Sequence, residues 1–181
     1  MIIVRAKPEE TNGILTFQGK EYVCALGRAG IVSAAHKCEG DGATPEGTWP
    51  MRKLHYRADR LAAPATGLPS RKIEMDDGWC DAPNDPAYNR PVKLPYPART
   101  ETLMRDDALY NIIIELGYND APPVAGKGSA IFFHVARAED GKGTPAYKPT
   151  EGCVAVEQED LLAIAAQLTR DMVMQIERMV P

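Results

Sequence analysis

Residues 129–135, Ser-Ala-Ile-Phe-Phe-His-Val, form an apolar run that begins directly after Gly126-Lys127-Gly128. A second run, Leu-Tyr-Asn-Ile-Ile-Ile-Glu-Leu at 109–116, is rich in β-branched residues. Short, nearly continuous apolar runs of this kind are typical of strands that are buried on both faces. Residues 153–156, Cys-Val-Ala-Val, fit a short strand or the entry to one. These segments predict a β-rich core with central strands at 109–116 and 129–135.

The N-terminal third also predicts β-structure. Residues 14–17 and 21–26 flank Gln18-Gly19-Lys20, which is typical of a short hairpin connection, and a further strand is predicted around 49–56. Between them, residues 40–47 are too rich in Gly and Pro for a regular element.

The C-terminal part contains the clearest helix signal. From Glu159 to Leu168 apolar residues recur at three- and four-residue spacing, which predicts an amphipathic helix. Thr169-Arg170-Asp171 is expected to end it, and residues 172–176 are compatible with a last strand or a helical turn.

Frequent Gly and Pro residues divide the chain into short segments. There are fifteen of each, which favours many brief strands and turns over a helical bundle. Residues 76–99 hold several of them together with Trp79, Tyr88 and Tyr96, so we expect a long ordered loop anchored by aromatic side chains. We expect a single domain over residues 1–181, mainly β, with a helix near the C-terminus.

Charge and hydropathy narrow the classes of partner. The formal net charge is −4, and no segment supplies the basic face that phosphate contacts require, so we expect no nucleic-acid partner. No apolar run approaches the roughly eighteen residues needed to cross a bilayer. Met1-Ile2-Ile3-Val4-Arg5 lacks the features of a secretory signal, which leaves a cytoplasmic location, another export route and a removed leader all open.

The four cysteines, Cys24, Cys38, Cys80 and Cys153, show no C-x-x-C spacing. His36, Cys38 and Cys24 match no zinc pattern, so we expect no metal site. A disulfide among Cys24, Cys38 and Cys80 remains possible in an oxidising compartment.

His134 and Cys153 carry the chemistry that the sequence suggests. A histidine within hydrogen-bond reach can take the proton of a thiol and later return it to a leaving group. Gly152, directly before the cysteine, removes a side chain that would block a substrate carbonyl and allows backbone N–H groups to face an oxyanion. The alternative is that both are core residues, since free Cys and strand-end His are often simply buried.

The surrounding residues resemble a known family. Residues 128–134, Gly-Ser-Ala-Ile-Phe-Phe-His, followed by 149–156, Pro-Thr-Glu-Gly-Cys-Val-Ala-Val, are similar to the catalytic segment of the YkuD-type L,D-transpeptidases. That pattern is a strand-end His, some fifteen to twenty residues, and then Ser/Thr-x-Gly-Cys. Residues 40–50, 85–91 and 109–111 resemble other parts of the family, in a variant branch, and the likeness spans about 27–168.

The resemblance implies a YkuD-like β-sandwich that acts on peptidoglycan stem peptides. The cysteine attacks the carbonyl after the third residue of a donor stem, a meso-diaminopimelate; D-Ala leaves, and the acyl group passes to an amine of an acceptor stem. Water as the acceptor gives an L,D-carboxypeptidase, and loss of the chemistry gives a peptidoglycan-binding module. No cofactor is implied, a backbone carbonyl such as that of Val135 orients the histidine, and the location is the periplasm or cell envelope. We expect a monomer.

Two positions depart from the family pattern. Glu151 stands where many members have His, and Ala155 stands where they have Arg. Arg137 and Lys148 could replace that charge, or could be solvated loop residues. As substrate contacts we predict Tyr88, Arg137 and Thr150; the alternative for Tyr88, which its position in a long ordered loop favours, is a role in packing alone.

Overall fold

The computed structural model describes residues 1–138 and 146–179, and this part of the chain is mainly β with a single helix near the C-terminus, as predicted. The strands are β1 (Ile2–Ala6), β2 (Asn12–Phe17), β3 (Lys20–Ala25), β4 (Ile31–Ser33), β5 (Thr44–Tyr56), β6 (Ser70–Lys72), β7 (Asp77–Cys80), β8 (Arg90–Lys93), β9 (Thr100–Thr102), β10 (Ile112–Leu116), β11 (Phe132–Val135), β12 (Val154–Val156) and β13 (Val173–Arg178). The helix α1 spans Gln158–Ala165.

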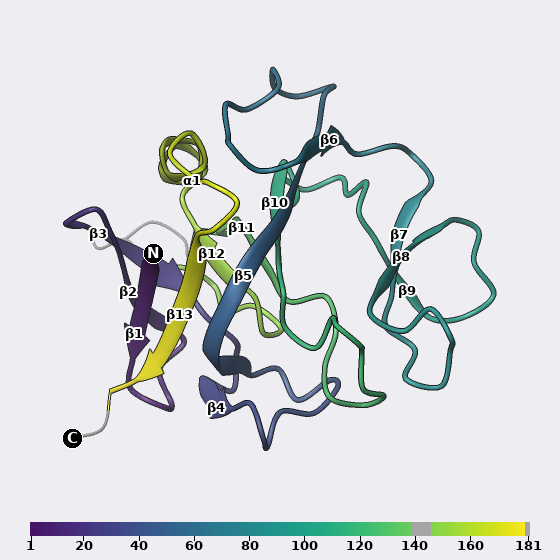
Figure 1. The fold of residues 1–181 in the computed structure, drawn as a ribbon, viewed down its shortest axis with the longest axis horizontal. Coiled ribbons are helices and arrows are strands. Elements are labelled where there is room, and N and C mark those ends of the chain that lie inside the picture. The colour runs from purple at the N-terminus through teal and green to yellow at the C-terminus, as the bar shows by residue number, and fades with distance from the viewer. Residues whose placement is uncertain (139–145, 180–181) are drawn as a thin grey trace.

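The larger sheet closes on itself. Its strands follow the order β10-β11-β12-β3-β2-β1-β13-β5, and β5 also pairs with β10. Closure depends on the length of β5, whose residues 47–50 pair with β13 while residues 51–56 pair with β10. Figure 1 shows β5 crossing the middle of the molecule between these partners. The short strands β4 and β6 join β5 at its two ends.

The alternating side chains of β11 explain why this strand is apolar throughout. Phe133 and Val135 point into the main core, together with the valines of β12. Phe132 belongs to a second apolar cluster on the opposite face, and His134 is buried on that same face because successive side chains alternate. The strand is therefore covered on both sides, and its second face leads to the candidate site.

A separate three-stranded sheet, in the order β8-β7-β9, supplies that cover. The ring of Trp79 in β7 meets Phe132 edge to face at 5.1 Å between ring centres. The prediction of one long loop over 76–99 is therefore wrong for β7 and β8. These strands have four residues each, too few for a clear period, and Pro91 is accommodated because β8 is an edge strand.

The prediction that residues 40–47 form no regular element is wrong for residues 44–47, which are the start of β5. The other sequence predictions hold with small shifts. The hairpin is confirmed as β2 and β3, where Gln18 and Gly19 both have positive φ, 49° and 78°. The central strands are shorter than predicted, at 112–116 and 132–135, and the helix ends three residues earlier than Leu168. Residues 173–178 form a strand parallel to β1, which decides the alternative left open for this segment.

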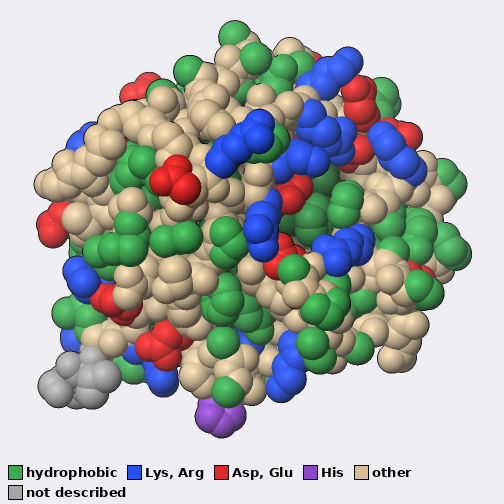
Figure 2. Space-filling view, in the orientation of Figure 1, with side chains coloured by type: hydrophobic (Ala, Val, Ile, Leu, Met, Phe, Trp, Pro, Cys, Tyr) green, Lys and Arg blue, Asp and Glu red, His purple; other side chains and the backbone are tan. Residues whose placement is uncertain are grey.

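Oppositely charged side chains mix on the surface. Figure 2 shows Lys and Arg side chains gathered at the centre and upper right of this face, with Asp and Glu side chains among them. In the described ranges 1–138 and 146–179, no helix has the length and apolar character needed to cross a membrane.

Candidate functional site

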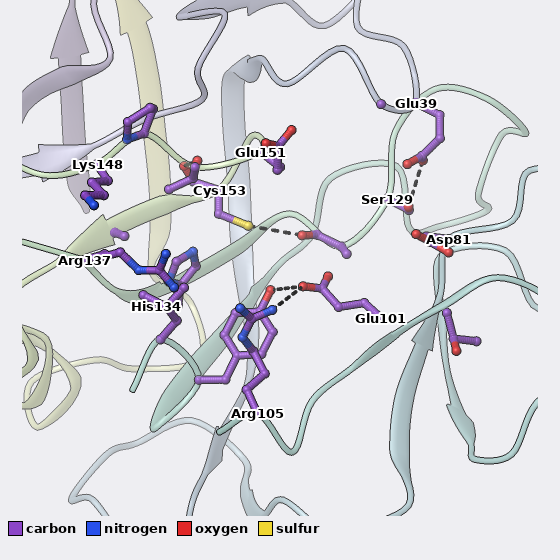
Figure 3. A pocket seen from close by; sticks show the side chains of 18 of the residues that line it. Glu39, Asp81, Glu101, Arg105, Ser129, His134, Arg137, Lys148, Glu151 and Cys153 are labelled. Carbon is purple, nitrogen blue, oxygen red and sulfur yellow. Dashed lines mark hydrogen bonds and ion pairs between the residues drawn. The ribbon is translucent and has the colours of Figure 1, made fainter. Parts of the chain in front are cut away.

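A cavity of about 660 Å³ opens where the three-stranded sheet faces β11 and β12. Cys153 and His134 both line it, and so do residues of β9 and of the loops before β10 and β12. Figure 3 shows the sulfur of Cys153 near the middle of this space, with charged side chains around it.

The register of two parallel strands brings Cys153 and His134 together. β11 and β12 pair so that His134 lies opposite Ala155. Cys153 is two residues before Ala155 and therefore on the same face, which makes it the diagonal neighbour of His134. Two residues that are 19 positions apart in the sequence thus lie on the same face of neighbouring segments of the sheet.

The Cys153 thiol is held by the backbone rather than by His134 in this structure. Its Sγ donates to the carbonyl oxygen of Ala130 and accepts from the N–H of Phe132, both at 3.3 Å. Burial raises the pKa of the thiol to about 12, and the charge of Glu101 adds to this effect. The resting nucleophile is therefore a neutral thiol.

His134 is oriented by its own strand. Its Nδ1 lies 2.8 Å from the carbonyl oxygen of Val135, the group that the resemblance implied. Because a carbonyl oxygen can only accept, Nδ1 carries the proton and Nε2 keeps its lone pair. Burial lowers the pKa of His134 to about 4, so the imidazole is neutral near pH 7. The ring of Tyr110 packs against the imidazole edge to face, at 5.4 Å between ring centres.

Thr150 and Gly152 shape the turn that presents the cysteine. The Thr150 Oγ1 donates to the carbonyl oxygen of Cys153 at 2.7 Å and accepts from the N–H of Gly152 at 3.1 Å. The predicted oxyanion donor at Gly152 is thus engaged by a side chain in this structure. Thr150 lines the cavity, but its hydroxyl serves the turn rather than standing free for a substrate.

Gly152→Ala is expected to destabilise the protein by roughly 1–3 kcal/mol. Gly152 has φ of +134°, and an added Cβ would lie 2.8 Å from the carbonyl oxygen of Ala43. Urea unfolding measures the loss. The matched control is Gly19→Ala, since Gly19 has φ of +78° but open space around its Cβ position. Equal losses in the two variants would show that the close approach to Ala43 contributes nothing.

Of the other residues predicted to contact substrate or to supply positive charge, some line the cavity and one does not. Arg137 and Lys148 line the cavity, and Arg137 donates to Asp107 Oδ2 at 2.9 Å. Tyr88 is not among the residues that line it. Its hydroxyl donates to Glu39 at 2.6 Å and accepts from the N–H of Gly128 at 2.9 Å, so Tyr88 supports the wall from behind. The structure thus places Tyr88 outside the lining in which a substrate contact was expected.

Glu151 and Ala155, the two positions that depart from the family pattern, have different surroundings in the structure. Ala155 is fully buried against Ala25 and Tyr147, which leaves that position without a charge. Glu151 is mostly exposed and pairs with Arg28 at 2.9 Å. Positive charge reaches the cavity from other segments, which carry Lys37, Arg99, Arg105, Arg137 and Lys148.

Several residues of the site had no role predicted from the sequence. Glu101 on β9 and Tyr110 before β10 both line the cavity, and the Tyr110 hydroxyl donates to Glu101. Arg105 binds Asp107 through two nitrogens, at 2.9 and 2.7 Å. Glu101 and Arg105 belong to short segments without a motif, and they line the cavity because the three-stranded sheet packs against β11 through Trp79 and Phe132.

The sequence also did not predict the role of Asn89, whose side chain holds the backbone next to the thiol. Its side chain is buried, and its Oδ1 accepts from the N–H of Ala130, the residue whose carbonyl oxygen holds the Cys153 thiol. The sequence offered only its membership of 85–91, with no indication of what it contacts.

The structure also bears on disulfide pairing and on metal binding. All four cysteines are free thiols, so the disulfide considered among Cys24, Cys38 and Cys80 does not form in this structure. Within the described part of the chain, no cluster of three or more His, Cys, Asp or Glu side chains could hold a metal ion.

Comparison with known proteins bears on the same segments. The model of the YkuD family, described as the L,D-transpeptidase catalytic domain, matches residues 9–176. No curated protein and no solved structure gave a match. The matched range covers most of the chain and includes the cavity, the Thr150–Cys153 turn and both pairing strands. The chain belongs to the YkuD family of L,D-transpeptidase catalytic domains.

Proposed function

We propose that this protein is a peptidoglycan L,D-transpeptidase in which Cys153 is the nucleophile and His134 the general base. The observation that carries the proposal is that both side chains open into one cavity while the Val135 carbonyl fixes the imidazole with its Nε2 lone pair unprotonated. Such a pair suits acyl transfer through a thioester. The family acts typically through cysteine chemistry on the cell wall, which supports this reading and a location in the cell envelope.

In the first half-reaction the thiol leaves the Ala130 carbonyl and gives its proton to His134 Nε2 as sulfur attacks the donor carbonyl carbon. The tetrahedral intermediate collapses when the C–N bond breaks, and the imidazolium protonates the departing amine of D-Ala. A thioester on Cys153 remains. In the second half-reaction His134 takes a proton from the acceptor amine, the amine attacks the thioester, and the sulfur leaves with that proton restored.

Arg137 and Lys148 are proposed to bind substrate carboxylates. They lie on the side of the cavity beyond His134, and they supply positive charge that the family pattern places at position 155. Guanidinium groups bind carboxylates through paired hydrogen bonds. Thr150 is proposed to act on the substrate only indirectly, through the turn that carries Cys153.

Incubation with a purified disaccharide-tetrapeptide, wild type beside Cys153→Ala, tests the proposal by mass spectrometry of the products. We expect a Cys153-dependent cross-linked dimer, and fragmentation would identify the joined positions. A shortened monomer with released D-Ala would instead indicate a carboxypeptidase with the same Cys–His pair. Identical product spectra from wild type and Cys153→Ala would contradict both and favour a binding module.

A further inference from the structure

The charges around the cavity are separated across the thiol. Figure 3 shows Arg137 and Lys148 on one side of Cys153, and Glu101 and Asp81 on the other. Arg105 lies below and joins the two sides, because it lies near Glu101 and binds Asp107, which Arg137 also contacts. A ligand that spans the thiol would therefore meet opposite charges at its two ends.

Most carboxylates of the cavity already have a cationic partner. Asp81 pairs with Arg99 at 3.0 Å, and Glu39 lies 3.5 Å from the same arginine while also accepting from two hydroxyl groups. Glu151 pairs with Arg28 at 2.9 Å. These groups have their charge offset within the protein.

Glu101 also has a cationic partner, but it is the most distant one among these four carboxylates. Its one hydrogen bond in the described structure comes from the Tyr110 hydroxyl, and its nearest cation, Arg105, lies 3.9 Å away. Arg105 directs two shorter hydrogen bonds to Asp107 instead. Burial raises the pKa of Glu101, whereas the hydrogen bond from Tyr110 and the charge of Arg105 act in the opposite direction. Beside it, Asp81 Oδ1 is buried without a hydrogen-bond partner among the described residues.

We infer that Glu101 is a specificity-determining residue that binds a primary ammonium group of the peptide substrate beside the Cys153 thiol. This inference rests on the proposed function and names a residue and a ligand group that the function alone does not. A stem residue whose side chain ends in both an ammonium and a carboxylate would place the ammonium at Glu101 and the carboxylate toward Arg137 and Lys148. Ammonium-to-carboxylate hydrogen bonds are among the stronger ones in partly buried sites.

The same contact would favour catalysis. The charge of Glu101 is the largest electrostatic contribution that keeps the Cys153 thiol protonated, second only to burial. An ammonium bound at Glu101 offsets that charge, so the ligand that is recognised also makes loss of the thiol proton easier. Glu101 would thereby contribute both to binding of the ammonium group and to activation of the Cys153 thiol.

Binding in the Cys153→Ala background tests the inference without any turnover. The probes are a synthetic tetrapeptide with diaminopimelate at its third position and the same peptide with the side-chain amine acetylated. Calorimetry should show that Cys153→Ala binds the free-amine peptide about 10- to 100-fold more tightly than the acetylated peptide. Adding Glu101→Gln should remove most of this preference, whereas adding Glu151→Gln, a glutamate that also lines the cavity, should preserve it.

A second variant covers the case in which Glu101→Gln fails to fold, as judged by its thermal unfolding midpoint. Glu101→Asp keeps the charge but withdraws it by one methylene, so it should weaken binding of the free-amine peptide and leave the acetylated peptide unchanged. An undiminished preference in Glu101→Gln, or no preference in Cys153→Ala, would overturn the inference. Absence of turnover in the wild type would count against the proposed function alone.

The ammonium can belong to the donor stem or to the acceptor stem, and kinetics of the intact enzyme separate the two. If it belongs to the donor, Glu101→Gln slows the release of D-Ala measured with donor alone. If it belongs to the acceptor, D-Ala release stays normal and the ratio of cross-linked to hydrolysed product falls.

Discussion

Replacing His134 by glutamine is expected to lower kcat/KM for acylation by about 100- to 10,000-fold, the usual contribution of a general base. The buried thiol has a pKa of about 12, so at pH 7 only roughly one molecule in 100,000 carries a thiolate. The wild type avoids this limit because Nε2 of His134 takes the proton as the bond forms. Release of D-Ala from a tetrapeptide donor, measured at low substrate concentration, gives the rates.

The pH profile distinguishes loss of the base from general damage to the site. The pKa of His134 is about 4, below its ordinary value because of burial, so the neutral base is present above that pH. Wild-type kcat/KM should therefore rise with pH through about 4 and stay level from about pH 5 to 8. In His134→Gln the reaction depends on free thiolate, so kcat/KM should rise about tenfold per pH unit throughout the neutral range.

Two other histidines provide controls for this profile. His36 is exposed and hydrogen-bonded to Ser33, and His55 is buried and lies 2.5 Å from Glu115. His36→Gln should leave the profile unchanged, and so should His55→Gln if the variant folds. A wild-type acidic limb near pH 6.5 would contradict the neutral resting pair and would indicate a histidine that titrates as in solution.

The fold could be predicted from the sequence wherever a periodic or continuous apolar pattern was long enough. The runs at 109–116 and 129–135 identified β10 and β11, and the hairpin at 18–20 was marked by its turn residues. β7 and β8 could not be found this way, because strands of four residues interrupted by Gly and Pro carry no period. Closure of the sheet through β5 could not be predicted either, since β5 pairs with residues of β10 that are 56–65 positions away and with residues of β13 that are 123–129 positions away.

The candidate site was predictable only along the two strands that bear its motif. Cys153, Gly152 and His134 belong to consecutive segments with recognisable patterns, and parallel pairing of β11 with β12 brings them together. Glu101 and Arg105 reach the same cavity through the packing of a different sheet, which no local pattern encodes. Tyr88 lies behind the cavity lining, because a sequence shows that an aromatic residue anchors a loop without showing on which side of the cavity wall its ring packs.

Asn89→Ala is expected to destabilise the protein by about 3–5 kcal/mol, the largest loss predicted for a residue outside the cavity. The Oδ1 atom accepts from Trp79 Nε1 at 2.9 Å and from the N–H of Ala130 at 3.0 Å. The Nδ2 atom donates to the carbonyl oxygens of Tyr118 and Asn119, at 3.2 and 2.8 Å. Alanine would leave four partner groups unsatisfied, at a position with φ of +55° that asparagine tolerates better. Urea unfolding measures the loss.

The effect should extend to the thiol, because Asn89 fixes the backbone that holds it. Ala130 has φ of +53°, and its N–H bond to Asn89 keeps its carbonyl oxygen directed at Cys153. Asn119→Ala is the matched control, since Asn119 also has positive φ and three side-chain hydrogen bonds but is only partly buried. It should lose about 1–2 kcal/mol and keep its acylation rate. If Asn89→Ala lost no more stability than this control, the four hydrogen bonds of the buried amide would contribute no extra stability. The position of the Ala130 carbonyl would then depend on the neighbouring strands alone.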